Sequence, residues 1–115
     1  MDASAALSEL LAVSTQVVEA VVIDSDRRVE AAHTSGDERT AALAAAGAEL
    51  LSAAASIRAA GAAPERVHVD LERGSLVAVT DGERSLVATT VAEPTAGLVA
   101  YDLRTALARL RGEAS

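Results

Sequence analysis

The sequence predicts an α+β domain, in which a five-stranded antiparallel sheet carries one long helix on one face and two terminal helices on the other. Three observations lead to this fold class. A helix-favouring stretch with few charges runs from Asp37 to Gly61, residues Arg66 to Glu72 alternate between polar and apolar, and Asp81-Gly82 is a strong hairpin dipeptide. Taken in order, the segments give α-β-β-α-β-β-β-α in a single domain of residues 1–115.

The first segments are a short helix and a hairpin. Leucines at helical spacing predict an amphipathic helix between Asp2 and Gln16, with Asp2 or Ser4 as its cap. The β-branched run Val17 to Asp24 is typical of a central strand that is covered on both faces. A short polar turn without the usual glycine then leads into a second strand, from Arg28 to His33.

The segment from Asp37 to Gly61 predicts a long helix, with Asp37 as its cap. Its inward arc on a helical wheel is Leu43, Gly47, Leu50, Leu51, Ala54, Ile57 and Gly61. Leu50 lies near the middle of this arc, so we expect it to anchor the core. The opposite arc is Ala41, Ala45, Ser52, Ser56 and Ala59. A surface helix usually carries charges there, so small residues on both arcs indicate cover on both faces. The alternative is that alanine is simply a good helix former in an alanine-rich chain.

The second half of the chain predicts a three-stranded meander and a last helix. Arg66 to Glu72 has the alternation of a half-exposed strand, and the strands Leu76 to Thr80 and Ser85 to Val91 follow on either side of Asp81-Gly82. Glu93, Pro94 and Thr95 begin the last helix. Its inward stripe is Val99, Leu103, Ala106, Leu107 and Leu110.

Composition excludes several classes of function. Half of the residues are hydrophobic, yet there is one tyrosine and no phenylalanine, tryptophan or cysteine, which predicts a thin core and rules out disulfides and thiolate metal sites. All ten basic residues are arginine, so a P-loop lysine is absent, and the net charge of −7 argues against nucleic-acid binding. We find no apolar run of about 20 residues and no leader segment, so we expect no membrane insertion and a cytoplasmic location.

Three groups of polar residues are candidates for metal-binding or catalytic sites. Asp24, Ser25 and Asp26 start like a calcium loop, but the required glycine and terminal glutamate do not follow. His33 and His68 stand in different strands without further ligands at metal spacing. His68 and Asp70 share a strand face, but we expect no hydrogen-bond geometry between them. We therefore predict no catalytic, cofactor-binding or metal-binding residues, and a protein that is not an enzyme.

Three stretches carry a family resemblance. They are Val18 to Asp24, Gly36-Asp37-Glu38 at the start of an Ala/Leu helix, and Gly97 to Arg104 in the last helix. With the order of elements, they resemble the roadblock family of dynein light-chain-like proteins, whose bacterial members regulate small Ras-like GTPases and whose fold is of the roadblock/longin/profilin kind. The sequence departs from the pattern at Arg27 and Arg28, where a glycine usually closes the first turn.

The resemblance implies a homodimer in which the third strands pair edge to edge and the long helices meet side by side. It also implies a non-catalytic platform that binds a small Ras-like GTPase or a related signalling partner and needs no cofactor. The residues expected at the dimer interface are Arg66, Val67, His68, Val69, Asp70, Leu71, Glu72, Ser52, Ser56 and Ala59. The alternative is a small-ligand sensor module of PAS-like or GAF-like shape, although such a sensor needs a cavity that this small-residue core does not favour.

Overall fold

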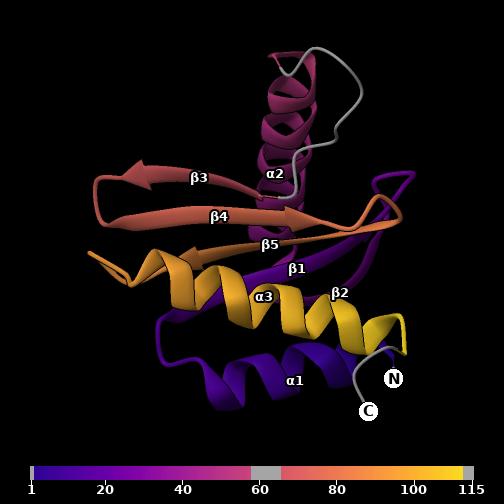
Figure 1. Ribbon diagram of the computed structural model, residues 1–115, viewed down its shortest axis with the longest axis horizontal. Coiled ribbons are helices and arrows are strands. Elements are labelled where there is room, and N and C mark those ends of the chain that lie inside the picture. The colour runs from indigo at the N-terminus through magenta and orange to yellow at the C-terminus, as the bar shows by residue number, and fades with distance from the viewer. Residues whose placement is uncertain (1, 58–65, 113–115) are drawn as a thin grey trace.

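The order of elements is that expected from the sequence (Figure 1). The computed structural model describes residues 2–57 and 66–112. The elements are α1 (Ala3–Val13), β1 (Val17–Asp24), β2 (Val29–His33), α2 (Asp37–Ile57), β3 (Arg66–Leu71), β4 (Gly74–Thr80), β5 (Arg84–Thr90) and α3 (Ala96–Leu110). The expected end of the long helix at Gly61 lies outside the described residues.

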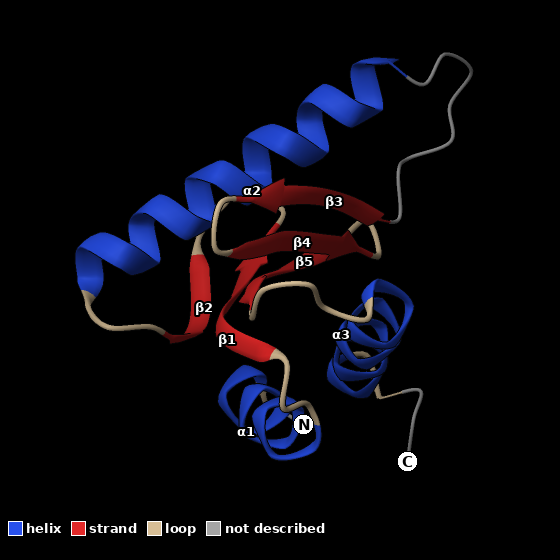
Figure 2. Ribbon diagram, turned by 90° about the vertical axis from the view of Figure 1, so that its left-hand side faces the viewer, coloured by secondary structure: helices blue, strands red, loops and turns tan. Residues whose placement is uncertain are grey.

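The five strands form one antiparallel sheet in the order β2-β1-β5-β4-β3. Helix α2 lies on one face, and α1 and α3 lie side by side on the other (Figure 2). The predicted fold class is thus confirmed. The β-branched run of β1 lies in the interior of the sheet as expected, next to β5, and β2 and β3 form the two edges.

The face covered by α1 and α3 holds the larger part of the core. Leu10 from α1 and Val99 and Leu103 from α3 are almost completely buried against Val22 and Leu86 of the sheet. Four residues of the inward stripe expected for α3 are buried, and the fifth, Leu110, is partly buried against them. Two antiparallel helices therefore cover this face with branched side chains.

The face under α2 is packed by smaller groups. The buried residues of α2 are Leu43, Ala44, Gly47, Ala48 and Leu51. At Gly47 the helix lies so close to the central strand β5 that a Cβ atom there would overlap the side chain of Val87. The expected helix orientation was therefore partly wrong. Leu50 is only partly buried and Ile57 is 84% exposed, because the buried face is rotated by roughly 60° from the expected arc, toward Ala44 and Ala48.

The polar ends of the elements have local explanations. Asp2 caps α1 as expected, since its carboxylate accepts a hydrogen bond from the amide of Ala5 at 2.8 Å. For α2 the expected cap was one residue late, because the carbonyl of Gly36 accepts the first helical bond, from the amide of Thr40 at 3.0 Å. Asp37 is instead in the first turn, where its charge faces the positive end of the helix dipole.

The structure of the β1–β2 turn shows what its acidic residue Asp24 does and how the turn forms without a glycine. The carboxylate of Asp24 accepts hydrogen bonds from the amides of Asp26 and Arg28 at 2.8 and 2.9 Å, so its role in the turn is structural. Arg27 takes φ +65°, the left-handed conformation that a glycine usually supplies. The turn is thus closed by the side chain of Asp24 without a glycine.

One expectation about the membrane needs correction. Helix α2 is long and apolar enough to cross a bilayer by length and composition, although no such run was recognised in the sequence. Alanines and a few leucines spread along the helix supply that apolarity. Such helices also occur in the cores of soluble proteins, and α2 packs along the sheet. However, only 28% of its most apolar window is buried within the chain, and Ile57 near its end is 84% exposed.

Candidate interaction surface

Strand β3 presents an open edge. It pairs with β4 from Arg66 opposite Val79 to Leu71 opposite Gly74, and its other side has no strand partner among residues 2–57 and 66–112. Val67 and Val69 are half-buried, and Leu71 is 50% exposed. Exposed strand edges offer unpaired backbone groups that readily pair with another chain. The strand expected at the edge is thus an edge strand, and it carries no proline that would block pairing.

The C-terminal half of α2 extends beyond this edge (Figure 1). Leu50 of α2 and Val67 of β3 both pack at the margin of the α2-side core, and Ile57 follows Leu50 two turns later with most of its surface exposed. An apolar flank of α2, made by Leu50 and Ile57, therefore adjoins β3. We call β3 together with this flank the β3–α2 surface.

The structure separates the interface residues expected from the sequence into two groups. Arg66, Val67, His68, Val69, Asp70 and Leu71 all lie on the open edge strand, and Glu72 follows directly after it. Ser52 and Ser56 lie on the exposed side of α2, where the hydroxyl of Ser56 donates to the carbonyl of Ser52 at 3.1 Å. Ala59 lies outside the described residues. Leu50 and Ile57 were not expected at the surface, because their helical spacing from Leu43 places them on the predicted inward arc.

The expectation that His68 and Asp70 are not hydrogen-bonded was wrong. Nε2 of His68 lies 3.1 Å from Oδ1 of Asp70, and the hydroxyl of buried Ser75 donates to the same oxygen at 3.0 Å. The register places Ser75 directly opposite Asp70, which explains how the carboxylate is held toward both groups. The three side chains fix the end of the β3–β4 hairpin. No bond joins the serine to the histidine among these contacts, so the arrangement does not activate the hydroxyl.

The two histidines lie on opposite edges of the sheet, His33 on β2 and His68 on β3. They cannot share a metal ion. Within the described part of the chain, no three His, Asp or Glu side chains gather in a group that could hold a metal. The predicted lack of a metal site stays a prediction.

A charged pair ties α2 to the sheet. Arg39 donates from Nε and Nη2 to the carboxylate of Glu19 at 2.8 to 3.0 Å, and Thr89 donates to the same carboxylate at 3.1 Å. The hydrogen bond from Arg39 lowers the pKa of Glu19, although burial of the carboxylate opposes the shift. The same pairing raises the pKa of Arg39. A carboxylate satisfied in this way joins α2, β1 and β5 and is a poor proton acceptor.

The chain is similar in structure to several solved proteins. A roadblock/LC7 domain from Streptomyces avermitilis has a TM-score of 0.85 at 22% identity, with 97% of each chain covered. The gliding protein MglB from Thermus thermophilus has a TM-score of 0.71 at 21% identity, covering 97% of this chain and 87% of that one. A second MglB structure, described as a tetrameric arrangement, has a TM-score of 0.72 at 21% identity with the same coverage.

These likenesses identify the architecture as the roadblock/LC7 fold. No protein-family model and no curated sequence matches the chain, so the relationship rests on structure. The resemblance drawn from the three sequence stretches is confirmed at the level of the fold. The sensor alternative had required a PAS-like or GAF-like domain, and the fold comparison favours the roadblock type instead.

Proposed function

We propose that this protein is a non-catalytic, cytoplasmic platform that forms a homodimer and binds a small Ras-like GTPase or a related signalling partner. The observation that carries the proposal is the β3–α2 surface, where an open strand edge adjoins an exposed apolar helix flank. A surface of this kind needs a partner that supplies both a strand and apolar side chains.

A second copy of the chain meets both needs. Two antiparallel β3 strands centred on Val69 would join the sheets through their backbone groups, and a twofold axis makes this contact self-complementary. In that register Arg66 of one copy faces the acidic end of the other strand. We call this contact between the two β3 strands the seam. The C-terminal half of α2 in each copy would then reach over the seam and bury its own Leu50 and Ile57 there. The tetrameric arrangement described for one MglB structure is consistent with self-association in this fold.

The GTPase is proposed from the family resemblance in the sequence. The net charge of −7 and the satisfied ion pair of Glu19 and Arg39 suit a protein-binding module better than a catalyst. We expect the protein itself to bind neither GTP nor ATP. Calorimetric titration with each nucleotide and magnesium should give no heat of binding, and a stoichiometric micromolar site would contradict a purely regulatory role.

The seam is tested by one substitution on each edge of the sheet. Val69→Pro removes the β3 amide that pairs with Leu76 of β4 and so distorts β3 at the centre of the expected contact, while Ala32→Pro places a proline in the middle of β2, the other edge strand. By light scattering, the parent and Ala32→Pro should have a mass near twice 11.6 kDa, and folded Val69→Pro should be a monomer. A monomeric parent at all concentrations, or a folded Val69→Pro dimer, would contradict the seam.

The partner is tested with the Ras-like GTPases encoded in the same genome. Each is loaded with GDP or with a non-hydrolysable GTP analogue and titrated with the protein by calorimetry. We expect one of them to bind in a nucleotide-dependent manner, and Val69→Pro to weaken that binding if the platform spans both subunits. Flotation with lipid vesicles is the control. If the protein binds the vesicles and floats with them, the apolar surface of α2 would serve membrane binding instead.

A further inference from the structure

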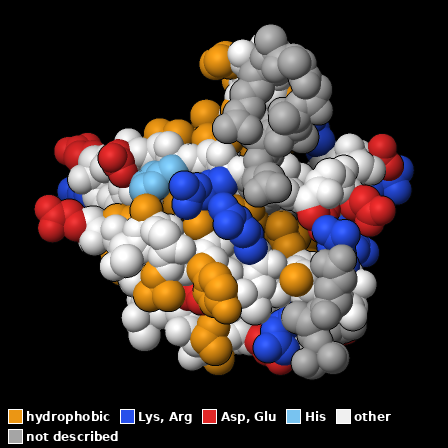
Figure 3. All heavy atoms as spheres, in the orientation of Figure 1, with side chains coloured by type: hydrophobic (Ala, Val, Ile, Leu, Met, Phe, Trp, Pro, Cys, Tyr) orange, Lys and Arg blue, Asp and Glu red, His pale blue; other side chains and the backbone are white. Residues whose placement is uncertain are grey.

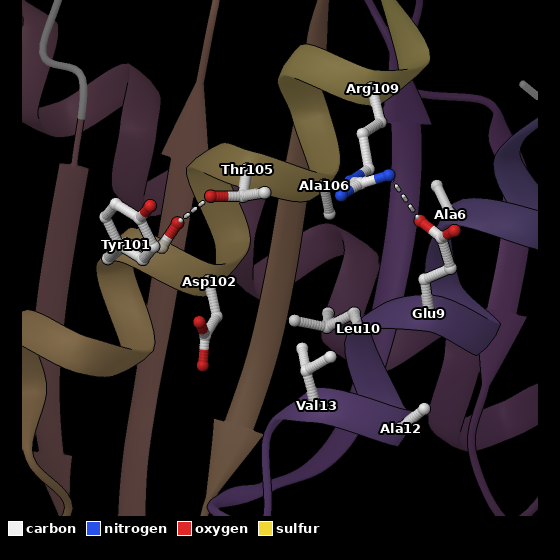
Figure 4. Close-up of a pocket in the computed structure, with 10 residues that line it drawn as sticks. All are labelled: Ala6, Glu9, Leu10, Ala12, Val13, Tyr101, Asp102, Thr105, Ala106 and Arg109. Atoms are coloured by element: carbon white, nitrogen blue, oxygen red, sulfur yellow. Dashed lines mark hydrogen bonds and ion pairs between the residues drawn. The ribbon is translucent and has the colours of Figure 1, made fainter. Parts of the chain in front are cut away.

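A groove runs between α1 and α3, on the sheet face opposite α2 and away from the β3–α2 surface (Figure 4). It has a volume of about 360 Å³. Its floor comes from Ala6, Leu10 and Ala106, which are almost completely buried, and its accessible sides include Val13 at the end of α1 and Tyr101 on α3. Two of the three floor residues are alanine, so the groove is floored by small side chains.

The rim of the groove is apolar and exposed. Val13 at the end of α1 is 70% exposed and Tyr101 on α3 is 66% exposed, and Leu98 lies one turn before Tyr101 with 50% exposure. Figure 3 shows hydrophobic side chains gathering over the first turns of α3 and the neighbouring end of α1. Single exposed apolar residues are normal on a protein surface, whereas several around one groove mark a contact site.

One carboxylate in this groove, that of Asp102, has no partner within the described residues. The side chain of Asp102 is directed into the space between the two helices (Figure 4), and it has no hydrogen bond or ion pair with any residue in the described ranges. The other charged groups are occupied. Glu9 pairs with Arg109 at 3.3 Å at the far end of the groove, and the hydroxyl of Thr105 donates to the carbonyl of Tyr101 at 2.9 Å. The groove therefore combines an apolar surface with a single available negative charge.

We propose that this groove binds an amphipathic helix of a partner protein. One apolar side chain of that helix packs against Val13 and Tyr101, and an Arg or Lys about one helical turn away pairs with Asp102. Asp102 favours a cationic group in the occupant, and the apolar rim favours apolar side chains around that group. An anionic lipid surface would be repelled by Asp102 and by the net charge of −7. The proposal does not depend on the β3–α2 surface, because that surface lies at the β3 edge and on the α2 side of the sheet.

The proposal is tested with two matched helical peptides. Both are 16-residue alanine-based helices with leucines at i, i+4 and i+7, and they differ only in Arg or Glu at i+3. Each is titrated to 2 mM into isotope-labelled protein while backbone amide shifts are recorded. The Arg peptide should shift the amides of α1 and α3, and the Glu peptide should bind about tenfold more weakly.

Three protein variants assign the contacts. Asp102→Asn should weaken binding of the Arg peptide about two- to fivefold and reduce the difference between the peptides. Val13→Asp should weaken binding of both peptides, and Glu38→Gln, which changes an exposed acid on α2, should leave it unchanged. Equal binding of the two peptides, an Asp102→Asn effect no larger than that of Glu38→Gln, or no shift in the two helices at 2 mM would overturn the proposal. If the amide shifts of α1 and α3 change with protein concentration in the absence of peptide, the groove binds a second copy of the chain, and the proposal is overturned.

Discussion

The two faces of the sheet are closed in different ways. On one face two antiparallel helices bury branched side chains such as Leu10, Val99 and Leu103 almost completely. On the other face a single helix buries two leucines, Leu43 and Leu51, beside the small residues Ala44, Gly47 and Ala48, and its end extends past the edge strand. The sheet is covered within the chain on the first face, where the exposed apolar residues lie on the outer side of α1 and α3, whereas the second face leaves the flank of α2 and the edge of β3 uncovered.

This difference indicates that the two faces contribute differently to stability and to association. Burial of large apolar side chains supplies most of the stabilisation of a small domain, so the α1/α3 face should dominate the stability of the fold. Small residues allow close backbone approach but bury little area per residue. The α2 face should therefore depend more on shape, on the pair of Glu19 and Arg39, and on association with another chain.

The sharpest contrast is between two leucines. Leu103→Ala removes a side chain with no exposed surface from the α1/α3 core and should cost about 2 to 5 kcal/mol of the free energy of unfolding. Leu50→Ala on the margin of α2 should cost only about 1 kcal/mol, since its side chain is already partly in water. Urea unfolding of both variants measures the difference. Equal losses would mean that the two faces contribute alike.

The closeness of α2 to the sheet is tested at a glycine. Gly47→Ala improves helix propensity, but its Cβ overlaps Val87 on the central strand, so we expect a net loss of about 1 to 2 kcal/mol. Gly97→Ala on α3 is the matched control, because nothing lies within 4 Å of the added atom. That variant should gain about 0.5 kcal/mol in thermal or urea unfolding. Stabilisation by Gly47→Ala would show that α2 can move away from the sheet at little cost.

The same glycine shows how far the sequence could predict the structure. Alternation at Arg66 to Glu72 and the β-branched run of β1 identify strands because side-chain period and branching act locally, and both strands formed as predicted. The orientation of α2 was misjudged because alanine and glycine carry little information about which side is buried. The helical wheel predicts Leu50 as a core residue because it lies in the middle of the apolar arc, whereas the structure buries Ala44 and Ala48 and leaves Leu50 partly buried. The bond between His68 and Asp70 was missed because Ser75, which also holds the carboxylate, comes from the neighbouring strand.

The smallest expected effect concerns pH. The pKa of Glu19 is lowered from its ordinary value of 4.5, chiefly by the hydrogen bond from Arg39, so its ionised form is favoured in the folded state. The stabilisation is therefore fully present above pH 4.5 and is lost as the pH falls through the lowered folded-state pKa. Glu19→Gln should be less stable than the parent at pH 7, and the gap should narrow as the pH falls below 4.5. Unfolding curves at several pH values measure it, and a gap that stays constant down to pH 2 would contradict the pairing.

The most direct test of the β3–α2 seam is hydrogen exchange at the two edges of the sheet. In a dimer joined through β3, the backbone amides of β3 that point away from β4 are bonded to the second copy, whereas the outward amides of β2 stay open to water. We predict that the outward amides of β3 exchange as slowly as those of the interior strands, that those of β2 exchange rapidly, and that Val69→Pro removes the protection of β3. Rapid exchange at both edges in the parent protein would contradict the account.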